Sequence, residues 1–183
     1  SVGAAPAGST LSLQGGAGND AYQLGGTGNL VDNIFIPVTI NDPSGTDSLT
    51  INDSADTSGD TIAITASTIT GINTSPAPNV TFTGIEALDV TATSGDDVIT
   101  TTFNGANTLA TVNVRGAAGD DDFFLTVADG LTSPATLNLI GDGGSDDFGS
   151  AANPLRPVIG PATNVGVYGD TTAVTTNPGG AVT

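Results

Sequence analysis

One short pattern returns along the whole chain: an apolar residue, any residue, a second apolar residue, and then a turn rich in Gly or Asp. Its copies begin at Leu11, Val38, Ile62, Leu88, Val112, Leu137 and Val165. The intervals between them are 27, 24, 26, 24, 25 and 28 residues. A unit of this length cannot bury its apolar side alone, but it can do so when it is stacked on its neighbours. The repeat therefore predicts an all-β chain that folds as a right-handed parallel β-helix, or β-solenoid, with about seven coils of roughly 25 residues.

Two Pro-rich segments, residues 73–79 and 149–164, interrupt the repeat and are expected to be loops inserted at turns. The predicted organisation is a linker or N-terminal cap over 1–10, a single β-helix domain over 11–176, and a C-terminal linker over 177–183. The chain starts at Ser1 without the apolar region of a signal peptide, so we expect either a processed mature chain or a fragment.

Charge narrows the range of partners. The chain has 19 acidic and two basic residues, and its net charge is −17. Nucleic acids and anionic membranes are recognised through basic patches, so neither is an expected partner. No apolar run of about 18 residues is present, so membrane insertion is not expected either. The acids need a cationic counterpart that the protein lacks, which favours polyvalent cations.

A second motif, G-x-D-x-apolar, follows the turn in most copies and begins at Gly18, Gly45, Gly95, Gly119 and Gly144. We expect these acidic turns to share one corner of the stacked coils, with no copy after Ile62. Stacking brings each Asp over the next, and Ca²⁺ takes six to eight oxygen ligands from carboxylates, carbonyls and water. Calcium is therefore the predicted cofactor. The candidate ligands are Asn19, Asp20, Asp47, Asp96, Asp97, Asp120, Asp121, Asp142 and Asp146.

A simpler interpretation is that Asp and Gly are present only for the backbone conformation of solvated turns. This interpretation is favoured for Asp53, Asp56, Asp89, Asp129 and Asp170.

The segment GGAGNDAYQL, residues 15–24, resembles the glycine- and aspartate-rich RTX repeat, which binds Ca²⁺ between coils. Two later turns match with one glycine replaced: Gly116, Gly119, Asp121 and Phe123, then Gly141, Gly144, Asp146 and Phe148. Together with residues 47–60 and 82–97, most of the chain is similar to β-helical repeat regions of very large bacterial surface proteins, including adhesins and S-layer-like proteins. This resemblance implies an extracellular, cell-surface location.

The expected function is a non-catalytic structural or adhesive module of an extracellular bacterial surface protein, stabilised by Ca²⁺ and able to self-assemble into a filament or lattice. Its partners would be copies of itself or adjacent solenoid domains, bound through open strand edges, with surface glycans as a further class. One alternative is a carbohydrate-active β-helix of the lyase or hydrolase type, with Asp96/Asp97 or Asp121/Asp122 as its acid pair. The other is an ice-binding adhesin module with threonine-rich faces. We expect no enzyme, because such acid pairs recur along the repeat, whereas a catalytic site would be unique.

Overall fold

A computed structural model describes residues 8–72, 80–105, 107–127, 134–149, 164–168 and 173–176. The predicted inserted loop over 73–79, most of the loop over 149–164 and the predicted linker over 177–183 lie outside these residues. The described chain is all-β apart from one short 3-10 helix, η1 (Gly26–Gly28). No helix in this part of the chain is long and apolar enough to cross a membrane.

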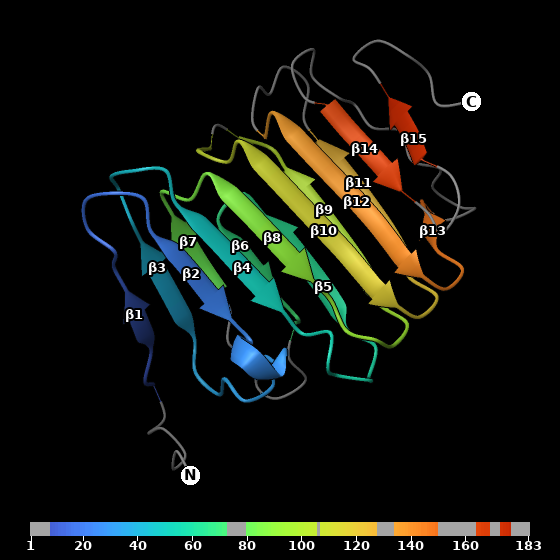
Figure 1. The fold of residues 1–183 in the computed structure, drawn as a ribbon, viewed down its shortest axis with the longest axis horizontal. Coiled ribbons are helices and arrows are strands. Elements are labelled where there is room, and N and C mark those ends of the chain that lie inside the picture. Colours follow the sequence, from blue (N-terminus) through green and yellow to red (C-terminus); the bar gives the residue numbers. More distant parts are fainter. Residues whose placement is uncertain are drawn as a thin grey trace.

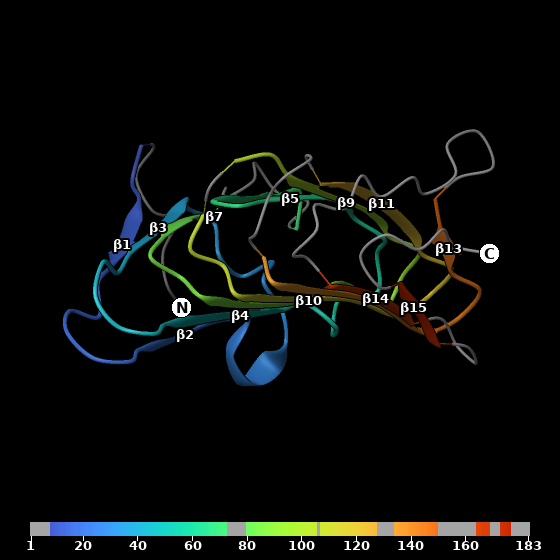
Figure 2. The same cartoon turned by 90° about the horizontal axis from the view of Figure 1, so that it is seen from above.

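The strands form two stacked sheets, which Figure 2 shows edge-on as two layers. In spatial order, the eight-stranded sheet A contains β1 (Leu11–Leu13), β3 (Val38–Asn41), β7 (Val80–Thr83), β6 (Thr68–Thr70), β5 (Thr61–Thr65), β9 (Val98–Phe103), β11 (Asp122–Val127) and β13 (Asp147–Phe148). The seven-stranded sheet B contains β15 (Ala173–Thr176), β14 (Asn164–Tyr168), β12 (Thr136–Gly143), β10 (Thr111–Ala118), β8 (Ala87–Thr91), β4 (Ser48–Asn52) and β2 (Ala21–Leu24).

The chain passes back and forth between the two sheets, and strands that are distant in sequence become neighbours (Figure 1). In sheet B, β2, β4, β8, β10, β12 and β14 pair in parallel throughout. Parallel strands must be joined by crossover connections, and the coils of a solenoid supply such connections. The two sheets are therefore consistent with a β-solenoid, and the number of coils stays a prediction.

An irregularity in the middle of sheet A changes how the sequence repeat maps onto the fold. There β5 and β6 pair antiparallel, β6 and β7 pair antiparallel, and the chain crosses to sheet B only after β7. The apolar motifs that begin at Leu11, Val38 and Ile62 consequently lie in sheet A, whereas those from Leu88 onward lie in sheet B.

The core lies between the sheets because apolar side chains alternate with polar ones along each strand. In β3 the pattern is clear, with Val38 and Ile40 buried and Thr39 exposed. The parallel register then places similar side chains of neighbouring strands next to each other. Phe123 pairs with Phe148, and their rings stack with centroids 4.8 Å apart.

Candidate metal centre

An acidic residue directly before a strand recurs in several of the turns. Asp20, Asp47 and Glu86 precede β2, β4 and β8, where the chain enters sheet B. The Asp20 backbone N–H donates to Asp47 Oδ1 at 2.8 Å, and the Asp47 N–H donates to Glu86 Oε2 at 2.7 Å. Each carboxylate thus accepts the peptide N–H of the acid one strand away. We call these three residues the first ladder.

Where the chain enters sheet A, a second ladder is formed by Asp60, Asp97, Asp121 and Asp146, which precede β5, β9, β11 and β13. The N–H groups of Asp60, Asp97 and Asp121 donate to the next carboxylate at 2.7, 2.9 and 3.2 Å. The expectation of a single acidic corner is therefore wrong. The acidic turns change corner after β4, because the chain stays in sheet A through β5, β6 and β7.

In three of these turns, the residue directly before the ladder Asp is a predicted ligand that lies at the surface. Asn19 accepts the Thr46 N–H at 3.0 Å, Asp96 accepts the Asp120 N–H at 2.9 Å, and Asp120 accepts the Ser145 N–H at 2.9 Å. These three predicted ligands are exposed. They connect neighbouring turns through hydrogen bonds and do not converge on one point.

Asp142 is also exposed, and it pairs with Arg115 at 3.3 Å. Arg115 is the one basic side chain in the described part of the chain. The buried acids of both ladders therefore have no cationic side chain among the described residues.

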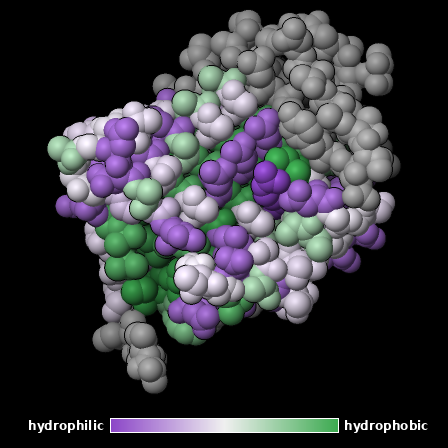
Figure 3. Space-filling model, in the orientation of Figure 1, coloured by the Kyte–Doolittle hydropathy of each residue, from purple (hydrophilic) through white to green (hydrophobic). Residues whose placement is uncertain are grey.

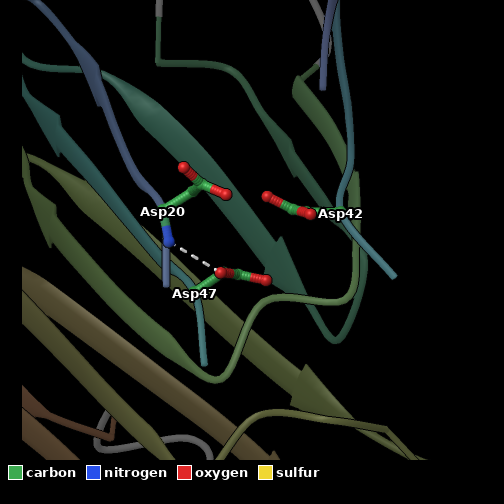
Figure 4. Close-up of side chains that lie close together, drawn as sticks. All are labelled: Asp20, Asp42 and Asp47. Atoms are coloured by element: carbon green, nitrogen blue, oxygen red, sulfur yellow. Dashed lines mark hydrogen bonds between the residues drawn. The ribbon is translucent and has the colours of Figure 1, made fainter. Parts of the chain in front are cut away.

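Three carboxylates do converge, and one of them was missed by sequence reasoning. Asp20, Asp42 and Asp47 each offer an oxygen within 4.8 Å of the others, and no other described group of three acids does so. Figure 4 shows the three side chains facing one another, with the hydrogen bond from the Asp20 N–H to Asp47. Asp42 follows β3, and Asp47 ends the same turn. We call these residues the first aspartate group.

Burial makes this convergence unfavourable without a cation. Asp42 is 0% exposed and Asp47 1% exposed. Asp20 Oδ2, Asp42 Oδ1 and Asp47 Oδ2 are buried, and no described residue donates a hydrogen bond to them. Burial, together with the charges of Asp42 and Asp47, raises the pKa of Asp20. Burying a carboxylate oxygen without a donor costs more free energy than losing an ordinary hydrogen bond. A bound cation would offset this cost.

Two neighbours shape the first aspartate group. The Tyr22 O–H donates to Asp42 Oδ2 at 2.6 Å, and burial together with this bond raises the pKa of Tyr22 to about 12. Gly15 also lies against the group, because a Cβ atom there would overlap the carboxylates of Asp20 and Asp42. Tyr22 therefore holds one oxygen of Asp42, while Gly15 leaves the space that the carboxylates occupy.

The donor set fits a hard cation. All three side chains offer oxygen, and the group contains no His or Cys. Oxygen-only sites suit Ca²⁺ and Mg²⁺ rather than softer transition metals. A metal ion bound here would take Asp20, Asp42 and Asp47 as ligands and would bridge the turns before β2 and β4.

A signal for Asp42 exists in the sequence. The residue five positions before the ladder Asp is Gly15, Gly116 and Gly141 in three turns, but Asp42 in the turn that ends at Asp47. In each of the three glycine cases a Cβ atom would overlap the ladder carboxylate. A side chain at this position, such as that of Asp42, therefore lies next to the carboxylate of the ladder Asp.

The interpretation of solvated turns holds only in part for Asp56, whose Oδ2 is buried, and fails for Asp53. Asp56 Oδ1 accepts the Ser58 N–H at 3.0 Å, which is the expected Asx turn. Asp53, however, is 0% exposed, and its Oδ1 accepts the Val31 N–H at 2.6 Å. Asp89 is exposed, and Asp129 and Asp170 lie outside the described residues.

Comparison of the chain with known protein families, with curated proteins and with solved structures finds no match in any of the three.

Proposed function

We propose that this chain is a non-catalytic structural or adhesive module of an extracellular bacterial surface protein, folded as a right-handed β-helix and braced by Ca²⁺. The observation that carries the proposal is the first aspartate group, in which three carboxylates converge and three buried oxygens have no described donor. A cation there would convert mutual repulsion into a bridge between neighbouring turns, so that folding becomes linked to Ca²⁺.

The repetition of the acids supports a scaffold over an enzyme. The second ladder repeats one hydrogen bond over successive turns, from Asp60 to Asp146. A general acid and base pair needs two groups in distinct surroundings, so that their pKa values separate. Equivalent carboxylates in a ladder serve instead as a repeated structural device.

The strand edges support association with further β-structure. Among the described strands, β1, β2, β13 and β15 have a neighbour on one side only, and β1 and β2 lie together at one end of the molecule (Figure 1). Figure 3 shows apolar surface gathered where β1 lies, and Leu11 of this strand is 38% exposed. Unpaired edges recruit other strands, so we propose this end as the contact with another copy or with a preceding solenoid domain.

Terbium luminescence tests the metal centre directly. Tb³⁺ replaces Ca²⁺ in oxygen sites, and a nearby tyrosine sensitises its emission. The chain has no Trp and two Tyr, and Tyr22 contacts the first aspartate group. Excitation at the tyrosine band should give strong Tb³⁺ emission that Ca²⁺ quenches by competition.

The controls are Tyr22→Phe, which should remove sensitisation but keep Ca²⁺ binding, and Asp42→Asn, which should remove both. Asp147→Asn makes the same charge change on an exposed residue and should change neither. Emission that is equal in the wild type and Asp42→Asn would show that no ion binds at this group, and the proposal would fail.

A further inference from the structure

The turn between β4 and β5, residues 53–60, holds a second set of buried carboxylates at the corner where the chain passes from sheet B to sheet A. Asp53 opens this turn, Asp60 closes it, and Asp56 lies between them. We call Asp53, Asp56 and Asp60 the second aspartate group. None of them belongs to the first aspartate group.

Asp53 is fully buried, but only one of its two carboxylate oxygens accepts a described hydrogen bond. Its Oδ1 accepts the Val31 N–H at 2.6 Å, whereas no described residue donates to its buried Oδ2. The carboxylate is therefore held in place by one hydrogen bond, and its second oxygen is buried without a described donor. Burial of an unsatisfied charge on this scale is strongly unfavourable.

Asp60 and Asp56 each have a buried carboxylate oxygen without a described donor as well. Asp60 is 5% exposed, and its Oδ2 is buried without a described donor. Asp56 Oδ2 is likewise buried without a described donor, although Asp56 Oδ1 accepts the Ser58 N–H. The three residues of the turn thus present three orphaned carboxylate oxygens.

The described charges that act on Asp53 and Asp60 are all negative. Burial, together with the charges of Asp32, Asp56 and Asp97, raises the pKa of Asp53 to about 6, although the Val31 hydrogen bond lowers it in part. Burial and the same neighbouring charges raise the pKa of Asp60 to about 7. Asp60 is also raised by Asp53 itself, so the groups interact. Both carboxylate oxygens of Asp97 already accept hydrogen bonds, one from the Asp60 N–H and two from Thr93.

We propose that Asp53, Asp56 and Asp60 form a second divalent-cation site, which takes Ca²⁺ through their three orphaned oxygens. The inference rests on the proposed function for the choice of ion, but not on occupancy of the first aspartate group. Only the first group has three oxygens within 4.8 Å of one another, so the second is more open. Ligands on opposite sides of Ca²⁺ lie about 5 Å apart, since each lies about 2.3 to 2.6 Å from the ion.

The site would fix two irregular parts of the fold. Asp53 binds the Val31 N–H, and Ala55 donates its N–H to the Asn29 carbonyl at 2.9 Å, so the turn holds the long connection between β2 and β3. The same turn leads into β5, which opens the antiparallel part of sheet A. An ion on this turn would therefore stabilise both segments that depart from the regular repeat.

Native mass spectrometry of the full chain in the presence of Ca²⁺ tests the inference by counting ions. The wild type should bind one ion at each group. The double variant Asp53→Asn/Asp60→Asn should lose one ion and keep the Tyr22-sensitised Tb³⁺ emission. Asp42→Asn should lose the other ion, and Asp147→Asn should lose none.

Asn keeps the acceptor oxygen for Val31 and removes the repulsion, so the double variant should fold. In chelator it should melt at the same temperature as the wild type or higher, but it should gain less from Ca²⁺. An unchanged ion count in the folded double variant would overturn the second site and leave the first intact. Loss of an ion in the double variant but not in Asp42→Asn would overturn the first site and leave the second.

Discussion

At the scale of the residue, a glycine five positions before the ladder Asp decides whether the carboxylate has room. A Cβ atom on Gly116 would overlap Asp121 Oδ2, and one on Gly141 would overlap Asp146 Oδ2. Neither glycine has a left-handed backbone. Glycine is therefore required at these positions for space and not for its conformational freedom.

We expect Gly116→Ala to destabilise the fold by about 1 to 3 kcal/mol, the usual cost of overpacking a tight site. Gly105→Ala is the matched control, because a Cβ atom there meets nothing within 4 Å. Urea denaturation of both variants in the same buffer measures the difference. Equal midpoints for the two variants would show that the Asp121 carboxylate does not need this space.

Asp121 gives a pH dependence whose sign follows from its surroundings. It is 1% exposed, and burial, with the charges of Asp97, Asp146 and Asp96, raises its pKa to about 7. The folded chain therefore holds this proton more tightly than the unfolded chain, whose Asp pKa is about 3.9. The resulting stability is complete below about pH 4 and is lost as the pH rises through 7.

In chelator, the melting temperature should accordingly fall between pH 4 and pH 7. Asp121→Asn keeps an oxygen that accepts the Asp97 N–H and should flatten this fall. The exposed acid Asp147, replaced by Asn, should leave the slope unchanged. A slope that is the same in all three proteins would contradict the assignment of the raised pKa.

The sequence predicted part of the candidate centre. Asp20 and Asp47 follow from the G-x-D motif, and the first aspartate group contains both. Asp42 was missed because it stands before a proline, outside that motif. The hydrogen bond that holds the buried Asp53 comes from Val31, in the connection between β2 and β3. A contact between such distant residues leaves no local pattern in the sequence.

At the scale of the element, the period-two apolar pattern identified strands but not their neighbours. Ile62 and Ile64 were correctly expected to be buried in a strand, and both lie in β5. Their alternation does not specify whether the next strand pairs in parallel or antiparallel. The antiparallel pairing of β5 with β6 therefore could not be predicted, and neither could the change of corner that follows from it.

The edge strands β1 and β2 give a testable prediction about association. Leu11 donates its N–H to Pro37 of the neighbouring segment, so the peptide groups of Ser12 point the opposite way in a parallel pair. By the same alternation, Asp20 accepts from Ser48 and the peptide groups of Gln23 point outward. Ser12→Pro/Gln23→Pro should therefore remove edge donors and leave the intramolecular pairing intact.

If the chain associates through this end, the wild type should form larger species as its concentration rises, and the proline variant should stay monomeric. Sedimentation velocity measures both, with Ser12→Ala/Gln23→Ala as the control that keeps the backbone donors. Association that persists unchanged in the proline variant would place the contact elsewhere.

At the scale of the whole molecule, two stacked, largely parallel sheets carry buried acids at both corners. The expectation of an all-β chain built from stacked parallel strands is confirmed by the two largely parallel sheets. Because the net charge is −17, we expect the stability of the molecule to depend on bound cations. A scaffold of this kind should be weak in chelator and strong in Ca²⁺.

Thermal unfolding followed by circular dichroism, in excess chelator and in Ca²⁺, tests this claim most directly. An ion at 100 times its dissociation constant adds about 2.7 kcal/mol, which is about 5 to 10 °C for a chain of this size. We predict such a rise for the wild type in Ca²⁺, a smaller rise in Mg²⁺, and a reduced rise for Asp42→Asn. Identical melting temperatures in chelator and in saturating Ca²⁺ would contradict this prediction.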